Sequence, residues 1–210
     1  MKKNIFALIG ITIAYIVIYL LNLKYVLTLD NINVIYEGVI NGDEEIAKKL
    51  YDSLNSSMLL GIIITSLTVL GKVFLIALII YIGYYLVEKQ NYKDILSSVI
   101  VAEVVNLITA LVKNINLAFI NPPSTYIDTT LTPFSLVSFF DPQKLDQWLL
   151  IPLSAVNIFE VIYILLLSYM LSKNLKRSFG NSCQMVLLSY GLVLVLFIVC
   201  TSFYALYATE

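Results

Sequence analysis

The sequence predicts an all-α membrane protein with five transmembrane helices, on the basis of composition, segment length and charge distribution. Of the 210 residues, 60% are hydrophobic and 13% are charged, whereas soluble domains are about 45–50% apolar and about 25% charged. The mean hydropathy is +0.88. One water-soluble domain of this length could not cover so much apolar surface, so the composition excludes an ordinary cytosolic enzyme and a disordered scaffold. The formal charge of −1 provides no attraction to nucleic acid, and we expect no nucleic-acid partner.

Five segments reach the roughly 20 apolar residues that a transmembrane helix needs. They are residues 5–23, about 60–87, about 95–118, about 149–172 and about 184–207. Two long connections (24–57 and 119–148) and two short ones (88–94 and 173–183) join them. The first segment is longer than the apolar region of a signal peptide and lacks a cleavage site, so we expect it to remain as a helix. The whole chain, 1–210, is expected to form a single membrane domain.

Basic residues predict the orientation, because cytoplasmic loops are enriched in Lys and Arg. With the N-terminus in the cytoplasm, seven basic residues fall on the inner side, namely Lys2, Lys3, Lys89, Lys93, Lys173, Lys176 and Arg177. Only Lys24, Lys48, Lys49 and Lys144 fall on the outer side. We therefore expect a cytoplasmic N-terminus and, after five crossings, an outer C-terminus.

Each long connection has a distinct pattern. No strong helix breaker separates Asp43 from Glu88, so the second span is expected to extend beyond the outer membrane surface as an amphipathic helix. Prolines exclude a long helix in the second connection. Its apolar run 131–140 is too short to span the bilayer, and it predicts a hairpin that lies on the surface or is partly re-entrant.

Of the charged residues that fall within the spans, three are weighed as candidates: Lys72, Glu103 and Glu160. A charged side chain at the bilayer centre costs about 2.5–3.5 kcal/mol on insertion scales, so each is a candidate functional residue. Asn106 lies three residues after Glu103, and Asn157 lies three residues before Glu160, which predicts a shared helix face for each pair. The first span adds the polar stripe Thr12, Tyr15, Tyr19 and Asn22. Lipid cannot satisfy these groups, so they are expected to face one another inside the bundle.

Two interpretations of this polar cluster remain open. In the functional one, Lys72 pairs with Glu103 or Glu160, and the cluster relays protons or binds a polar solute. In the structural one, protonated carboxylic acids and the Asn side chains join the helices through hydrogen bonds. The spacing of the residues does not choose between them.

Catalytic and nucleotide-binding motifs are missing from the sequence. Because the chain contains no His, a Ser-His-Asp triad and an H-E-x-x-H zinc motif are impossible. Neither a Walker loop nor a G-x-G-x-x-G motif is present. The sequence therefore predicts a protein that is not an enzyme and has no metal or other cofactor.

A short run in the fourth span resembles a known family. Asn157, Phe159, Glu160 and Tyr163 match the Asn-x-Phe-Glu-x-x-Tyr run of bacterial members of the Yip family of integral membrane proteins. The segment from Tyr84 to Leu96 is similar to the loop between spans two and three of that family. The resemblance implies five helices without established catalysis. Eukaryotic members act in vesicle trafficking, and some bacterial members look like accessory proteins of ABC-type exporters.

Two functions follow as hypotheses. The first is an accessory or regulatory subunit of a membrane complex, such as an ABC-type exporter, in the bacterial cytoplasmic membrane. Its partners would be the lipid bilayer and either a transporter complex or further copies of the same chain. The alternative is a small transporter or permease component that uses Lys72, Glu103, Asn106, Asn157 and Glu160. It predicts a water-accessible cavity between spans two, three and four.

Overall fold

The computed structural model describes residues 2–40 and 43–208, and within these ranges its regular structure is helical apart from an isolated β-bridge between Ser135 and Asn157. The first six α-helices are α1 (Lys2–Tyr25), α2 (Leu29–Ile35), α3 (Glu37–Ile40), α4 (Glu44–Ser56), α5 (Met58–Val87) and α6 (Tyr92–Ile115). The others are α7 (Tyr126–Thr130), α8 (Gln147–Ala155), α9 (Ile158–Asn174), α10 (Phe179–Val186) and α11 (Leu192–Ala208). Two π-helical turns, η1 (Asn116–Ile120) and η4 (Leu187–Gly191), and two 3-10 turns, η2 (Leu136–Phe139) and η3 (Pro142–Lys144), complete the set.

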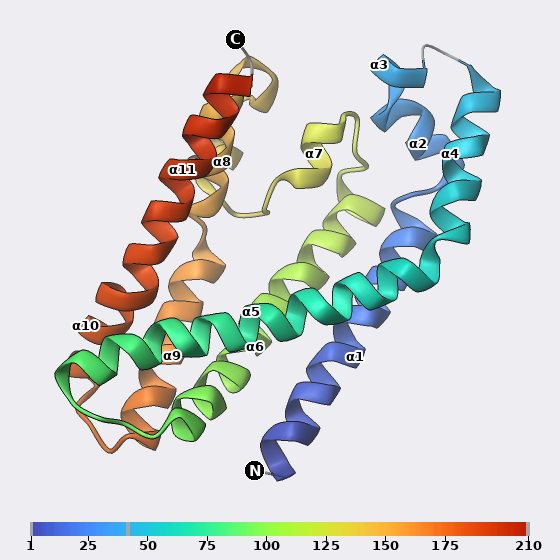
Figure 1. Cartoon of the computed structure of the whole chain (residues 1–210). Helices are drawn as coiled ribbons and strands as arrows, with labels where there is room; N and C mark the ends of the chain where they lie inside the picture. The colour runs from blue at the N-terminus through green and yellow to red at the C-terminus, as the bar shows by residue number, and fades with distance from the viewer. Residues whose placement is uncertain (1, 41–42, 209–210) are drawn as a thin grey trace.

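Within the described ranges, four helical stretches are long and apolar enough to cross a membrane. They are Lys3–Tyr25, Met58–Val87, Tyr92–Ile120 and Phe179–Tyr207. These stretches confirm the all-helical class and four of the expected spanning segments. In Figure 1, the start of α1 and the end of α11 lie at opposite ends of the molecule, and α5 runs obliquely across the other long helices.

The remaining expected span, 149–172, is divided into α8 and α9. Val156 and Asn157 have extended backbones between the two helices, and Pro152 lies inside α8. An interrupted helix leaves backbone groups unpaired, and lipid cannot satisfy them. Here the apolar hairpin supplies partners, since the Leu136 amide donates to the Val156 carbonyl at 3.0 Å and the Ile158 amide donates to the Phe134 carbonyl at 3.4 Å.

The predicted hairpin at 131–140 therefore folds back against the α8–α9 break. Ser135 and Val137 are buried, while Phe134, Phe139 and Phe140 are exposed. As the prolines predicted, none of the helical turns between residues 121 and 146 exceeds five residues.

The helix expected to continue from Asp43 to Glu88 is two helices, because α4 ends at Ser56 and α5 begins at Met58. The prediction of one continuous helix was therefore wrong. It had considered only Gly and Pro as helix breakers, and neither residue type lies at this interruption. The hydroxyls of Ser56 and Ser57 donate to carbonyls of the preceding turn, at Ser53 and Leu54. Such local hydrogen bonds compete with helix continuation.

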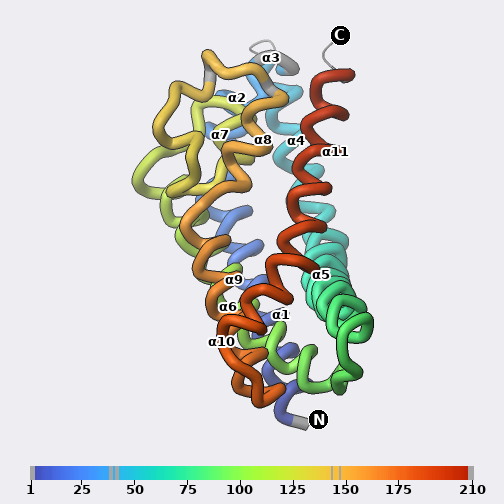
Figure 2. The backbone as a smooth tube through the Cα atoms, turned by 90° about the vertical axis from the view of Figure 1, so that its left-hand side faces the viewer, coloured from blue at the N-terminus to red at the C-terminus, as the bar shows by residue number. Residues whose placement is uncertain are grey.

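The two long connections gather at one end of the bundle, which we call the loop-rich end (α2–α4 and α7–α8). Both views place these helices together there (Figures 1 and 2). Ile32, Ile40 and Ala47 form a small buried core between α2, α3 and α4. The opposite end, the hairpin end, carries the turns 88–91 and 175–178. There Arg177 forms an ion pair with Glu88 and lies 5.6 Å above the Tyr84 ring.

Helix α6 is the centre of the bundle, since it packs against α1, α5 and α9. The main core combines buried residues from these helices, including Val73, Ile80, Val99, Ala102, Tyr163 and Leu167. The last long helix consists of α10, η4 and α11. Its α11 part packs against α8, its α10 part packs against α9, and its η4 turn contacts α5.

Gly83 permits the close contact between α5 and η4. A Cβ atom at this position would lie 2.9 Å from the Cβ of Ser189, which sits on rigid backbone. We expect Gly83→Ala to lower the free energy of unfolding by about 1–3 kcal/mol through overpacking. Gly71→Ala on the same helix is the matched control, because nothing lies within 4 Å of its Cβ. It is expected to stabilise α5 by about 0.5–1 kcal/mol, and equal effects of both variants in reversible unfolding experiments would contradict the close contact.

Candidate functional site

The Glu103 carboxylate joins three helices. It is fully buried on α6, with 0% of its side chain exposed. Its Oε1 atom accepts hydrogen bonds from Lys72 Nζ of α5 and from the Tyr15 hydroxyl of α1, each at 2.8 Å. Its Oε2 atom accepts from Asn106 Nδ2 at 3.0 Å. The structure thus brings together Lys72, Glu103 and Asn106, three of the five residues of the predicted polar cluster, and Tyr15 of the polar stripe contributes as well.

This cluster is well satisfied in chemical terms. The charge of Lys72 compensates the carboxylate, and two neutral donors occupy its other lone pairs. A buried ion pair adds little net stability compared with apolar packing, but the loss of one partner leaves a buried charge unpaired. The Lys72–Glu103 pair is therefore a strong constraint on how α1, α5 and α6 pack.

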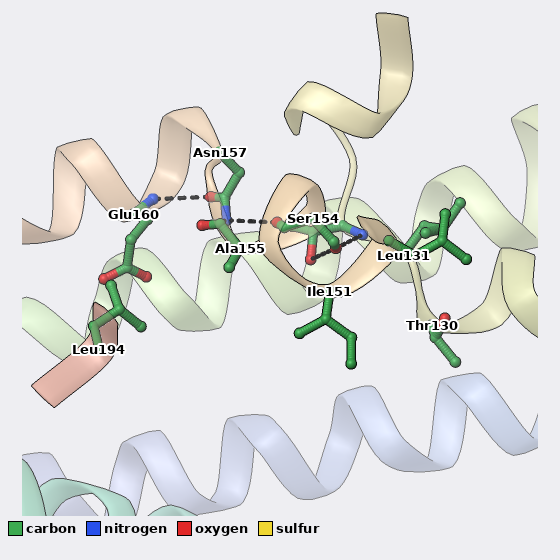
Figure 3. A pocket seen from close by; sticks show the side chains of 10 residues that line it. Thr130, Leu131, Ile151, Ser154, Ala155, Asn157, Glu160 and Leu194 are labelled. Carbon is green, nitrogen blue, oxygen red and sulfur yellow. Dashed lines mark hydrogen bonds between the residues drawn. The ribbon is translucent and has the colours of Figure 1, made fainter. Parts of the chain in front are cut away.

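Asn157 and Glu160 lie at a different place, at the α8–α9 break. Asn157 is the N-cap of α9, because its Oδ1 atom accepts a hydrogen bond from the Glu160 amide at 2.9 Å. Its Nδ2 atom donates to the carbonyls of Ser154 and Ala155 (Figure 3). The prediction that Asn157 and Glu160 share one helix face was therefore wrong for Asn157, which precedes the helix and orders the break.

The Glu160 carboxylate is half-buried and accepts a hydrogen bond from the Tyr190 hydroxyl at 2.8 Å. Tyr190 belongs to η4, a π-helical turn in the last long helix, and such turns are frequent at functional sites. Among the described residues, no direct hydrogen bond joins Glu160 to the Glu103 cluster.

Glu160 lines a cavity of about 310 Å³ beside the break. Figure 3 shows its carboxylate close to Leu194 of α11, with Asn157 and Ser154 farther along the cavity. The lining combines apolar and polar side chains: Thr130, Leu131, Thr132, Leu150, Ile151, Ser154, Ala155, Asn157, Glu160 and Leu194. The cavity is thus built by α8 and α9, which make up the expected fourth span, together with α11 and the 130–132 segment. The transporter hypothesis placed it between spans two, three and four, but none of its lining residues comes from the expected spans two and three.

The two remaining residues of the Yip-like run support this region. The Phe159 ring packs edge-on against Phe134 of the hairpin, with 6.1 Å between ring centroids. Tyr163 is fully buried, and its ring lies 5.5 Å from that of Tyr190. Phe159 therefore holds the hairpin against the break, and Tyr163 lies beneath Glu160 in the bundle interior.

A second cavity, of about 360 Å³, lies at the loop-rich end and shares Leu131 and Thr132 with the first. Its lining includes Lys113 and Asp128. A hydrogen bond of 3.3 Å between the hydroxyls of Ser154 and Thr132 spans the shared wall. The 131–132 segment therefore lies on the wall between the cavity that Glu160 lines and the one at the loop-rich end, which we call the outer cavity.

Asp128 orders the outer cavity wall through a capping box with Thr125. Burial raises the pKa of Asp128, but hydrogen bonds from Ser124 and Thr125 outweigh the effect of burial and hold the pKa below its usual value.

The lowered pKa of Asp128 in the folded state stabilises the fold at pH values above the unfolded pKa of about 4, and this stability is lost as the pH falls through the folded-state pKa. We expect the protection of backbone amides in 121–131 against hydrogen exchange, relative to the intrinsic exchange rate at each pH, to fall in that acidic range. In Asp128→Asn this protection should already be low at neutral pH and insensitive to acid, and a wild-type-like protection profile of this variant would contradict the role of Asp128.

Sequence reasoning missed Tyr190 and the cavity residues contributed by the 130–132 segment. Tyr190 is one of 15 tyrosines, so its type alone carries no signal.

Among the described residues, no group of three or more His, Cys, Asp or Glu side chains is arranged to hold a metal ion. None of the protein-family models, curated proteins or solved structures compared with the chain matches it.

Proposed function

We propose that the protein is a small transporter or permease component of the bacterial cytoplasmic membrane, which accepts a small amphipathic cation at Glu160 from the outer side. The observation that carries this proposal is a single carboxylate in a largely apolar cavity at a helix break. Interrupted helices form the solute and ion sites of many transporters, where irregular backbone lines a cavity. No enzymatic step is part of the proposal.

The chemistry of the cavity favours an amphipathic cation over other solutes. Its volume of about 310 Å³ is at the lower end for ligand pockets, which fits a small organic molecule. Leu131, Leu150, Ile151 and Leu194 would contact alkyl groups, and the Glu160 carboxylate would neutralise the positive charge. The hydroxyls of Thr132 and Ser154 lie where this cavity adjoins the outer cavity. In this proposal the cation therefore reaches Glu160 from the outer cavity.

In this proposal, α8 and α9 together form the fourth of five crossings. They contain 9 and 17 residues, which correspond to about 13 and 25 Å and together exceed the roughly 30 Å of hydrocarbon. The hairpin end then faces the cytoplasm, in agreement with its Lys and Arg residues. Alkaline phosphatase fused to the C-terminus is expected to be active, because that end lies outside. An inactive phosphatase at the C-terminus would contradict the topology.

Cysteine protection tests the cavity. We expect Thr132→Cys, in protein whose Cys183 and Cys200 are replaced by Ser, to react with a membrane-impermeant thiol reagent added outside. Tetraethylammonium at ten times its dissociation constant should slow this reaction by about tenfold. Ser97→Cys, which lines a separate cavity at the hairpin end, is the matched control and should be neither labelled from outside nor protected.

Transport itself is tested in lipid vesicles that contain the purified protein. We expect them to take up radiolabelled tetraethylammonium faster than protein-free vesicles do. The proposal fails if tetraethylammonium neither protects the thiol of Thr132→Cys nor enters the vesicles.

A further inference from the structure

A cavity of about 550 Å³ at the hairpin end lies apart from Glu160 and from the Glu103 cluster. The beginnings of α1 and α6 line it, together with Phe74 of α5. Figure 1 shows the N-terminus at the same end of the molecule as the turns after α5 and α9. The cavity shares no lining residue with the one that Glu160 lines, so the proposed function does not use it.

The lining of this cavity changes from polar to apolar along both helices. On α6, Lys93 and Asp94 lie in the first turn, whereas Ile100 lies about 9 Å further along the helix than Asp94. On α1, Asn4 comes one turn before Leu8. A phospholipid has the same order, since its charged headgroup lies at the membrane surface and its acyl chains extend into the hydrocarbon core.

Two features indicate that the cavity lies at the surface of the bilayer and is reached from it. Tyr92 lines the polar end and packs edge-on against Tyr81, with 5.5 Å between ring centroids, and Tyr side chains are enriched where membrane meets water. Ile5 and Phe74 line the apolar part and are exposed on the protein, so in a membrane they contact acyl chains. A lipid therefore reaches this cavity directly from the bilayer.

Lys93 and Asp94 give the polar end of the cavity one positive and one negative charge. Adjacent residues of a helix do not face each other, and among the described residues neither side chain forms an ion pair. Asn4 and Ser97 in the wall are bonded to each other, since the Ser97 hydroxyl donates to Asn4 Oδ1 at 3.3 Å. The cavity is therefore complementary to a ligand that carries both an anionic and a cationic group.

We infer that this cavity binds phosphatidylethanolamine, a phospholipid whose phosphate contacts Lys93 and whose ammonium group contacts Asp94. The beginning of one acyl chain follows the apolar wall formed by Ile5, Leu8 and Ile100. A primary ammonium group donates N–H bonds to a carboxylate, and such charge-assisted bonds are about twice as strong as neutral ones. Phosphatidylcholine has no N–H group to donate, and phosphatidylglycerol has no cation to pair with Asp94. The inference depends on neither the solute nor the orientation of the proposed function.

Native mass spectrometry of the purified protein tests the headgroup, with an equimolar mixture of phosphatidylethanolamine, phosphatidylcholine and phosphatidylglycerol that carry identical chains. We expect the wild type to retain phosphatidylethanolamine about tenfold or more over each of the other lipids. In Asp94→Asn the preference over phosphatidylcholine should vanish. Lys93→Met should weaken the retention of all three lipids, because each contains the phosphate. Lys89→Met is the matched control, since Lys89 is also exposed at the hairpin end but does not line the cavity, and its lipid retention should equal that of the wild type.

A second pair of variants tests the place of binding. Ile5→Trp fills the apolar part of the cavity and should lower the retention of phosphatidylethanolamine by about tenfold. Ile9→Trp is the matched control, because Ile9 lies one turn later on α1 and is 49% exposed, against 50% for Ile5, but does not line the cavity. Its retention of the lipid should be unchanged.

Equal retention of the three lipids by the wild type overturns the inference, and so does an Asp94→Asn variant that keeps the wild-type preference. A preference for phosphatidylglycerol also overturns it, because only the positive charge would then act. Equal effects of Ile5→Trp and Ile9→Trp would place the lipid elsewhere, and a wild-type dimer without lipid would show that a second copy covers the cavity; both results contradict the site. None of these outcomes changes the protection of the Thr132→Cys thiol by tetraethylammonium, so failure of this inference is distinct from failure of the proposed function.

Discussion

Replacing Lys72 by Met is expected to lower the free energy of unfolding by up to about 3–5 kcal/mol, the cost of leaving a buried charge unpaired, because Glu103 is fully buried although the Lys72 side chain is 38% exposed. The Met side chain keeps the volume and apolar stem of Lys72, so the loss comes from the uncompensated Glu103 carboxylate, which is fully buried. Reversible unfolding of the purified protein in mixed micelles measures this free energy.

The double variant K72M/E103L should recover at least half of this loss, because it removes both charges and leaves an apolar contact. Lys49→Ala is the matched control, since it breaks an exposed Lys49–Glu45 pair on α4 with side chains 73% and 77% exposed. Its effect should stay within about 0.5 kcal/mol. A K72M variant as stable as K49A would show that the Lys72–Glu103 pair does not constrain the bundle.

The second large effect is expected for Glu160→Gln, which should weaken tetraethylammonium binding by about 30-fold or more. Loss of one member of a half-buried, hydrogen-bonded charge pair costs about 2–5 kcal/mol, and each 1.4 kcal/mol is tenfold in affinity. Gln retains the shape of Glu160 and can still accept from the Tyr190 hydroxyl, so packing should be preserved. Equilibrium binding of the radiolabelled cation measures the effect.

Asp94→Asn serves as the control for Glu160→Gln. Asp94 is also half-buried, but it lies in the first turn of α6 at the hairpin end and lines another cavity. The affinity of the Asp94→Asn variant for tetraethylammonium should equal that of the wild type. If both variants bind equally well, the cation does not bind at Glu160.

Hydropathy predicted the four long helices because segment length and apolar content alone decide whether a helix can cross lipid. It could not predict the α8–α9 break, although the signals were present. Asn157 followed three residues later by Glu160 is a helix-start pattern, and Pro152 weakens the preceding turn. Within an apolar segment of spanning length, these local signals were outweighed by the expectation of a continuous helix.

The resemblance to the Yip family and the role as an accessory subunit stay predictions.

The candidate site was predictable in part for a similar reason. Spacing along the sequence placed Asn106 on the helix face of Glu103, and it left Glu103 and Glu160 as alternative partners of Lys72. Spacing does not specify which helices are neighbours, however. The contact of Glu160 with Tyr190 depends on the packing of the last helix, and the cavity depends on a hairpin whose backbone pairs with the break. Both arise from tertiary structure that no local pattern encodes.

The ion pair in the bundle interior also affects how the chain is made. Lys72 and Glu103 are 31 residues apart on consecutive helices. At a synthesis rate of about 5–20 residues per second, the ribosome adds the acidic partner roughly 2–6 s after the basic one. During that interval the ammonium group of a nascent α5 lacks its Glu103 partner, whereas Tyr15 has already been synthesised. Biogenesis therefore favours the entry of α5 and α6 into the bilayer as one neutralised hairpin over their insertion one at a time.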